Sequence, residues 1–293
     1  MSIAYYDGQY VERDTIRINP TDFGFARGIT LFELARVYGG TPFYLQEHLQ
    51  RLNRGAKMLN LPLPTLPELS NLTRQVIDRN AYPHSAVKFY LTAGECDRPS
   101  GSSYNACEGF TPHLMIFEDE VTPKHPEAPY GLELYKSGQR LKTVPYDREL
   151  PMLKTTNYLT GFYAARQVAG ADYDDILFTH RDGYITEATR SNFFCVIDDV
   201  LVTPQRGMLL GITRHVLLEI ATELGINTIE RDLFPADLAQ ATEAFTTGSI
   251  AELVPARSID DNHLATTMDG KIFTALRQAF SAKVQAYSQL VTV

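Results

Sequence analysis

The sequence predicts an α+β (mixed α/β) fold in two domains, built on sheets that are antiparallel or mixed. A length of 293 residues suits about two hydrophobic cores. Short strand-like runs meet at Asp-Gly and Gly-Gly turns, and amphipathic helices lie between them, which is typical of this class. A segment with three prolines separates the halves. We therefore expect a first domain over residues 1–120, a linker over 121–130 and a second domain over 131–293.

The composition is that of an ordinary globular protein, with 44% hydrophobic and 21% charged residues. A formal net charge of -8 argues against a nucleic-acid or membrane partner, which would need a basic surface. Cys96, Cys107 and Cys195 are too few and too widely spaced to predict a disulfide framework or a metal site. The chain begins without a basic leader, and no apolar run reaches the roughly 20 residues of a membrane span, so we expect a cytoplasmic protein.

Turn signals and apolar spacing predict the individual elements. Asp7-Gly8, Gly39-Gly40 and Asp182-Gly183 are typical of hairpin turns, because such turns need positive φ. Apolar residues at helical spacing indicate helices over residues 45–60, 67–80, 158–170, 212–224 and 270–287. Strands are expected over residues 3–6, 9–11, 34–38, 42–45, 86–92, 113–118, 132–136, 192–197, 200–203 and 243–247.

Lys154 is the first candidate for chemistry. It lies in Leu150-Pro-Met-Leu-Lys154-Thr-Thr-Asn-Tyr158, an apolar-to-polar segment rather than a charged run. A partly desolvated lysine gives up its proton more readily, which frees the amine to attack an aldehyde. On the local sequence alone, the commoner explanation is a lysine whose aliphatic chain packs against the protein while its ammonium group reaches water.

Other segments suit an anion or a pyridine ring, although each has an ordinary explanation. Glu187, just after a hairpin, is either solvated or turned inward, where it could hold a proton on a pyridine nitrogen. Gly211-Ile212-Thr213 starts a helix whose N–H groups suit a phosphate, yet threonine is common at helix starts. Thr247-Gly248-Ser249 is a loop that could approach a phosphate or form a plain turn. Arg51 is a phosphate candidate or an exposed helical arginine.

The order of these segments resembles the fold-type IV pyridoxal-phosphate enzymes over nearly the whole chain. The motifs that carry the resemblance are His48-xx-Arg51-Leu, Leu153-Lys154-xx-Asn157-Tyr158, Glu187-xxx-Ser191-Asn192, Gly211-Ile212-Thr213-Arg214 and Thr247-Gly248-Ser249.

The resemblance implies a cofactor, a set of site residues and an oligomeric state. Lys154 would hold pyridoxal 5'-phosphate as a Schiff base and move a proton, and Glu187 would hold the pyridine nitrogen. The members are homodimers in which each active site takes part of the partner's N-terminal domain. The remaining cofactor-binding residues implied by the resemblance are Arg51, Tyr158, Ser191, Asn192, Ile212, Thr213, Gly248 and Ser249.

The substrate is harder to predict. The segment from Leu34 to Tyr44 resembles D-amino-acid aminotransferases, since branched-chain enzymes usually carry a more aromatic one. Arg98 lies about where those enzymes bind the substrate carboxylate, but Ser100 replaces their histidine. Arg27 and Arg190 are alternative carboxylate ligands, because an arginine meets a carboxylate through two parallel hydrogen bonds. Each could equally form an ordinary ion pair.

We therefore expect a transaminase that moves an amino group between a D-amino acid and a 2-oxo acid by a ping-pong mechanism. The arginine pattern resembles a less common group of D-amino-acid transaminases, some of which also accept (R)-amines. The alternatives are an L-branched-chain amino acid aminotransferase, a lyase similar to aminodeoxychorismate lyase, and a non-catalytic dimer that retains the fold.

Overall fold

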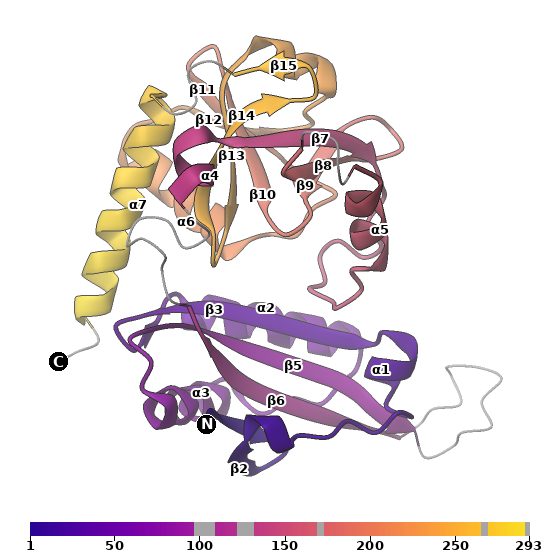
Figure 1. The fold of residues 1–293 in the computed structure, drawn as a ribbon. Coiled ribbons are helices and arrows are strands. Elements are labelled where there is room, and N and C mark those ends of the chain that lie inside the picture. The colour runs from indigo at the N-terminus through magenta and orange to yellow at the C-terminus, as the bar shows by residue number, and fades with distance from the viewer. Residues whose placement is uncertain (97–108, 122–131, 169–172, 265–268, 291–293) are drawn as a thin grey trace. The chain divides into compact units, whose positions relative to one another are not determined.

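The computed structural model describes residues 1–96, 109–121, 132–168, 173–264 and 269–290, and its helices and strands are labelled in Figure 1. Two compact units make up the chain. The first comprises Met1–Thr122 and Leu153–Asn157, and the second comprises Pro123–Met152 and Tyr158–Val293. Each contains its own sheet and helices, which confirms the predicted α+β class.

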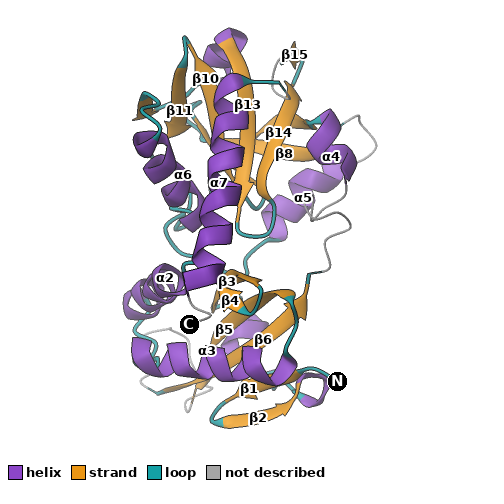
Figure 2. Ribbon diagram, turned by 90° about the vertical axis from the view of Figure 1, so that its left-hand side faces the viewer, coloured by secondary structure: helices purple, strands orange, loops and turns teal. Residues whose placement is uncertain are grey.

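The first unit is a six-stranded sheet in the order β2-β1-β6-β5-β3-β4, in which every neighbouring pair is antiparallel. Helices α2 and α3 pack on one face of this sheet (Figure 2). The strands are β1 Ile3–Tyr6, β2 Gln9–Glu12, β3 Thr30–Tyr38, β4 Thr41–Pro42, β5 His84–Cys96 and β6 Phe110–Glu120. The helices are η1 Arg13–Thr15, α1 Phe23–Arg27, α2 Leu45–Met58 and α3 Leu66–Asn80.

Apolar side chains at alternate positions of β3 and at helical spacing on α2 form the core of this unit. Leu31 and Val37 on β3 are buried against Leu49 and Leu52 of α2.

Helix α3 starts at a capping box, in which the Thr65 hydroxyl accepts the Glu68 N–H while the Glu68 carboxylate accepts the Thr65 N–H.

The second unit is a nine-stranded sheet in the order β12-β11-β10-β13-β14-β7-β8-β9, with β15 beside β14. Because β9 also pairs with β10, the strands β10, β13, β14, β7, β8 and β9 close into a ring. Its strands are β7 Gln139–Pro145, β8 Asp175–Thr179, β9 Ile185–Ala188, β10 Asn192–Ile197, β11 Val200–Pro204, β12 Thr228–Arg231, β13 Ala241–Gly248, β14 Glu252–Ile259 and β15 Asn262–His263. Its helices are α4 Leu132–Ser137, α5 Leu159–Val168, α6 Ile212–Glu223, η3 Pro235–Gln240 and α7 Lys271–Leu290.

The ring of strands has an apolar interior, and two helices cover its outside. Cys195 on β10 and Ala244 on β13 belong to the inner core. On the outer face, the Phe245 ring lies 5.3 Å from Phe194 and 5.4 Å from Phe273 of α7, measured between ring centroids. Helices α6 and α7 therefore pack on the outer side of β13 (Figure 1).

Some predicted elements are wrong. Residues 132–136 form helix α4 instead of a strand, because their short apolar alternation is compatible with either structure. Helix α1, Phe23–Arg27, was not among the predicted elements; Asp22 caps it by accepting the Gly24 N–H, and Gly28 ends it with a φ of 71°. The predicted strand over residues 42–45 ends at Pro42, and Leu45 begins α2.

The structure also addresses two expectations drawn from the composition, one about the cysteines and one about membrane-spanning helices. Cys195 carries a free thiol, whereas Cys107 lies outside the described residues. Burial raises the pKa of Cys195 to about 12, so this thiol is a packing group. None of the helices in the described ranges is long and apolar enough to cross a membrane.

Candidate active site

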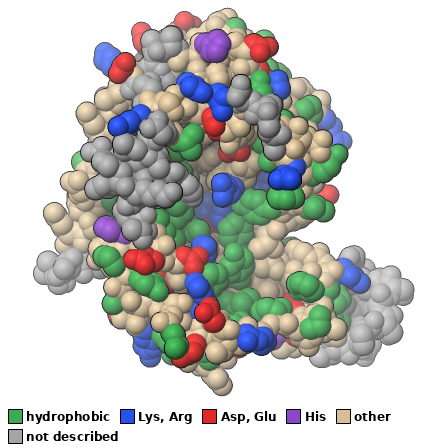
Figure 3. All heavy atoms as spheres, in the orientation of Figure 1, with side chains coloured by type: hydrophobic (Ala, Val, Ile, Leu, Met, Phe, Trp, Pro, Cys, Tyr) green, Lys and Arg blue, Asp and Glu red, His purple; other side chains and the backbone are tan. Residues whose placement is uncertain are grey.

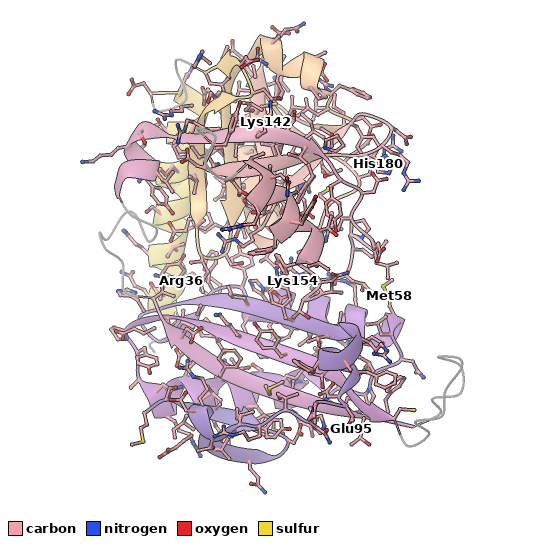
Figure 4. All side chains as sticks on the ribbon, turned by 45° about the vertical axis from the view of Figure 1, so that its right-hand side comes forward. Arg36, Met58, Glu95, Lys142, Lys154 and His180 are labelled. Atoms are coloured by element: carbon pink, nitrogen blue, oxygen red, sulfur yellow. The ribbon has the colours of Figure 1, made fainter. Side chains whose placement is uncertain are left out.

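The segment that carries Lys154 is fixed against β3 of the first unit. The Lys154 carbonyl accepts the Phe32 N–H at 2.8 Å, and Leu31 and Thr155 form an antiparallel bridge. Leu153 is 2% exposed and packs in the core of this unit. The Lys154 ammonium lies 4.4 Å from the centre of the Phe32 ring. Figure 4 labels Lys154 beside the strands of the first unit. The backbone of this lysine is therefore held rigidly on both sides.

A buried ion-paired cluster lies in the same unit. Glu33 on β3 is fully buried and accepts two hydrogen bonds of 2.8 Å from Nε and Nη2 of Arg51 on α2. The same carboxylate lies 3.0 Å from Nδ1 of His48. Arg51 is thus a buried arginine, 7% exposed, and the ordinary interpretation of an exposed helical arginine is wrong.

The charges in this cluster oppose the effect of burial on Glu33. Burial alone would raise the pKa of Glu33, but the Arg51 guanidinium and His48 hold it well below its usual value. Burial is the main reason that the pKa of His48 is lowered, and the charges of Arg51 and Lys154 lower it further. At neutral pH the cluster therefore combines an ionised carboxylate, a guanidinium and a neutral imidazole.

In the second unit, three polar side chains lie in a row across neighbouring strands. Asn192 on β10 is opposite Glu187 on β9 and opposite Thr247 on β13. Residues that face each other across strands point to the same side of a sheet. All three are buried, with exposures of 5%, 6% and 1% for Asn192, Glu187 and Thr247. Glu187 is therefore buried and not solvated.

Glu187 is oriented by two donors. Its Oε1 lies 2.5 Å from Nη1 of Arg148, and its Oε2 accepts the Leu209 N–H at 3.2 Å. Asn192 donates to the Leu209 carbonyl at 2.7 Å. The backbone just before α6 is therefore held by two of the three residues of the polar row, Glu187 and Asn192.

The start of α6 and the end of β13 form a small-residue cradle beside this row. The N-cap of α6 is Gly211, and no described side chain caps the helix and no acidic residue lies in its first turn. A Cβ on Gly211 would lie 2.0 Å from the Asn192 amide oxygen, so only glycine fits there. Ile212 and Thr213 follow and are 8% and 5% exposed. Their N–H groups and the positive end of the helix dipole suit an anion.

Gly248 and Ser249 extend this cradle from the end of β13. A Cβ on Gly248 would lie 3.4 Å from the Arg190 carbonyl and 3.8 Å from Cβ of Ser191, so the two backbones approach closely. Next to Gly248, the buried Thr247 hydroxyl has no hydrogen-bond partner among the described residues. An unpartnered polar atom at such a place is expected to bind something outside the protein chain.

The side chains of the remaining predicted residues are exposed or lie outside the described residues. Tyr158 precedes α5 and is 39% exposed. Arg27 is exposed at the end of α1, where its Nη1 donates to the Ala26 carbonyl. Arg190 is exposed near Asp175. Arg98 lies outside the described residues.

Sequence reasoning missed two charged residues that the structure brings into these clusters. Glu33 occupies an inward position of β3 between Leu31 and Ala35, so a charge at a core position was the available signal for a buried ion pair. Arg148 follows β7 in an irregular segment, where neither spacing nor periodicity indicates a partner.

Comparisons with known proteins show the family to which the chain belongs. A family model described as amino-transferase class IV matches residues 30–259. A Methanocaldococcus jannaschii protein with the provisional name branched-chain-amino-acid aminotransferase is 30% identical over 284 residues, which cover 94% of each chain. The aminodeoxychorismate lyase of Bacillus subtilis is 28% identical over 297 residues, which cover 97% of this chain and 95% of the lyase.

Solved structures match over nearly the whole chain as well. The branched-chain aminotransferase of Thermoproteus uzoniensis, solved with norvaline, is 26% identical with a TM-score of 0.85, covering 98% of this chain and 95% of its own. The Escherichia coli branched-chain amino acid aminotransferase is 25% identical with a TM-score of 0.85, covering 96% and 94%. The protein belongs to the class IV aminotransferases, and its α+β fold is that of fold-type IV enzymes.

The cofactor of this family is pyridoxal 5'-phosphate. The residues of the second unit fit it. The first N–H groups of α6 have no side-chain cap among the described residues, which suits a phosphate, and the unpartnered Thr247 hydroxyl lies next to Gly248. Glu187 is a buried carboxylate that can accept a further hydrogen bond from a pyridinium, because two oxygens offer about four acceptor sites.

Proposed function

We propose that this transaminase moves an amino group between an L-amino acid with an aliphatic side chain and a 2-oxo acid by a ping-pong mechanism. The observation that carries the proposal is the match to branched-chain aminotransferases in sequence and in structure over more than nine tenths of the chain. A small-molecule amino donor and a 2-oxo acid acceptor are then its two substrates.

The residues described above supply the roles that such a reaction needs. Bound pyridoxal phosphate supplies an aldehyde for amines and a ring that withdraws electrons. Lys154 would hold the cofactor through its aldehyde and would move the proton at the substrate α-carbon, because a lysine amine is both nucleophile and base once it has lost its proton. Glu187 holds the proton on the pyridine nitrogen. The other cofactor-binding residues that we propose are Arg51, Tyr158, Ser191, Asn192, Ile212, Thr213, Gly248 and Ser249.

A preference for D-amino acids is the second candidate. It is favoured by the hairpin from Leu34 to Tyr44, which resembles D-amino-acid aminotransferases. The arginines that suggested it are less supportive. The side chains of Arg27 and Arg190 are both exposed. The relatives reported above are named for branched-chain amino acids or for aminodeoxychorismate, so the L-specific function takes precedence.

A half-reaction titration of the purified protein tests these alternatives. L-leucine, L-glutamate, D-alanine, D-glutamate and (R)-1-phenylethylamine are added singly, and the absorbance of the bound cofactor is followed. Conversion by L-leucine and L-glutamate supports the proposal. Conversion by the D-amino acids alone replaces it with the second candidate. Release of pyruvate from aminodeoxychorismate without an acceptor points to a lyase, the activity of the Bacillus subtilis relative.

We also propose that the protein is a homodimer, as the resemblance implies. Helix α5 presents a stripe of exposed apolar side chains at helical spacing, Leu159, Phe162 and Tyr163, with exposures of 74%, 65% and 62%. Figure 3 shows hydrophobic side chains at the surface in the region of this helix. Apolar patches of this kind usually mark interfaces. Light scattering after gel filtration tests the dimer, and Phe162→Glu should weaken it.

A further inference from the structure

Arg148 and Glu187 form an ion pair that is largely shielded from water. Nη1 of Arg148 lies 2.5 Å from Oε1 of Glu187, and the two side chains are 23% and 8% exposed. The other oxygen of Glu187 accepts the Leu209 N–H. Both oxygens of this carboxylate are therefore oriented by donors that belong to the second unit.

The backbone before Arg148 is tied to the neighbouring hairpin. The Tyr146 N–H donates to the Thr179 carbonyl at 2.8 Å, at the end of β8. The Asp147 carboxylate accepts the Arg181 N–H at 2.8 Å and also pairs with the Arg181 side chain. Arg148 follows these two anchored residues directly, so its side chain starts from a fixed point.

The chemistry of the pair determines the state of the carboxylate. A guanidinium keeps its proton at any pH that a protein tolerates. At this short distance, and shielded from water, it favours the ionised form of Glu187 over the neutral acid. An ionised carboxylate that faces a pyridine nitrogen draws a proton onto that nitrogen, whereas a neutral acid can only donate its own.

We propose that Arg148 is a positioning residue that acts through Glu187. By holding this carboxylate ionised and in place, it keeps the proton on the pyridine nitrogen of pyridoxal phosphate. The inference rests on the role given to Glu187 under the proposed function. A protonated ring withdraws electrons more strongly than a neutral one, so turnover depends on Arg148 although this residue need not touch the substrate.

Nitrogen-15 NMR of the bound cofactor tests the proposal. Pyridoxal phosphate labelled at the ring nitrogen is bound at neutral pH to the wild type and to the Arg148→Gln, Arg148→Lys and Glu187→Gln variants. Arg206→Gln is the matched control, because it removes an arginine paired with Asp232 that is 55% exposed in the same unit. In Arg148→Gln, we expect the resonance to move toward that of neutral pyridine and kcat to fall about 10- to 100-fold, with a smaller change in KM.

The variants separate this inference from the assignment on which it rests. Arg148→Lys should keep the resonance near the wild-type position, since the positive charge is retained, and Arg206→Gln should not move it. If Glu187→Gln moves the resonance and Arg148→Gln does not, the role of Arg148 is wrong and that of Glu187 stands. If Glu187→Gln leaves it unchanged, the assignment of Glu187 itself fails. Should Arg148→Gln lack the wild-type circular dichroism spectrum, Arg148→Ala replaces it with the same expectation.

Discussion

Glu187 and Asn192 face each other across β9 and β10, and they bind the backbone N–H and the backbone carbonyl of the same residue, Leu209. Glu187 accepts the Leu209 N–H at 3.2 Å, and Asn192 donates to the Leu209 carbonyl at 2.7 Å. Leu209 precedes Gly211, the N-cap of α6. The strand pair that positions the carboxylate therefore also positions the proposed phosphate cradle.

The first prediction concerns Asn192→Ala. The substitution leaves the buried Leu209 carbonyl without its donor, which typically costs about 1–3 kcal/mol, and releases the segment that leads into α6. We expect the Kd for pyridoxal phosphate to rise about tenfold, while the Kd for pyridoxal, which has no phosphate, changes less. Fluorescence titration measures both. Asn262→Ala, in an exposed position on β15, should change neither value. Equal losses for the two ligands would show that Asn192 does not act on the phosphate.

The second prediction concerns Lys154→Ala. Without this amine, borohydride treatment of the protein with pyridoxal phosphate should add no cofactor mass to the peptide around residue 154. Turnover should fall to background. Lys142→Ala removes a lysine that pairs with Asp260 elsewhere in the chain, and it should retain both the mass addition and the activity. Labelling of another peptide in Lys154→Ala, with activity preserved, would overturn the assignment of this lysine.

Much of the fold could be predicted because its signals are local. The spacing of Leu45, Leu49 and Leu52 indicated α2, which runs from Leu45 to Met58. Asp182-Gly183 indicated the hairpin of β8 and β9. Helix α4 was missed because its sequence alternates like a strand, and the deciding contact is distant. The hydroxyl of Tyr135 donates to the Ala251 carbonyl, which lies 116 residues away in sequence.

The site was predictable only in part, for a related reason. The ordered motifs predicted Lys154, Glu187 and the start of α6 as candidates, because each is a short local sequence. Charge partners are different. The pairs formed by Arg148 with Glu187 and by Arg51 with Glu33 join residues 39 and 18 positions apart. Only the tertiary structure brings such side chains together, so no periodic pattern in the sequence predicts which charged residues pair.

The third prediction concerns Glu118, a fully buried carboxyl group on β6. Ser85 donates to one of its oxygens, and the other has no partner among the described residues. Burial raises the pKa of Glu118 above its usual value. The folded protein therefore holds the protonated form more tightly than the unfolded chain does. Stability is fully present below the unfolded pKa and falls as Glu118 ionises at higher pH.

Glu118→Gln removes this dependence, because an amide does not ionise. We expect the variant to be more stable than the wild type at pH 8, with the advantage disappearing near pH 4. Between the two pKa values the difference grows by up to about 1.4 kcal/mol per pH unit. Urea unfolding over this pH range measures it. Glu120→Gln, at an exposed position on the same strand, should show no such trend.

The fourth prediction concerns His113 on β6. Each of its two ring nitrogens lies within hydrogen-bonding distance of an acidic side chain. Its Nε2 lies 2.8 Å from Glu95 on β5, and its Nδ1 bonds Asp7 in the turn between β1 and β2. Burial alone would lower the pKa of His113, but the bonds and charges of these two carboxylates raise it above its usual value. The stabilisation is therefore complete below the unfolded pKa of about 6.5 and is lost as the pH rises through the higher folded pKa.

His113→Gln should consequently destabilise the protein at pH 6 and have little effect at pH 9. The three side chains are 19% to 34% exposed, so solvent screening limits the expected loss to about 1 kcal/mol or less. Urea unfolding at the two pH values measures the loss, and His263→Gln, exposed on β15, serves as the control. A loss that grows from pH 6 to pH 9 would mean that the neutral imidazole stabilises the fold. The N-terminal hairpin would then be held by packing, such as the Tyr6 ring 5.9 Å from the His113 ring, and not by charge.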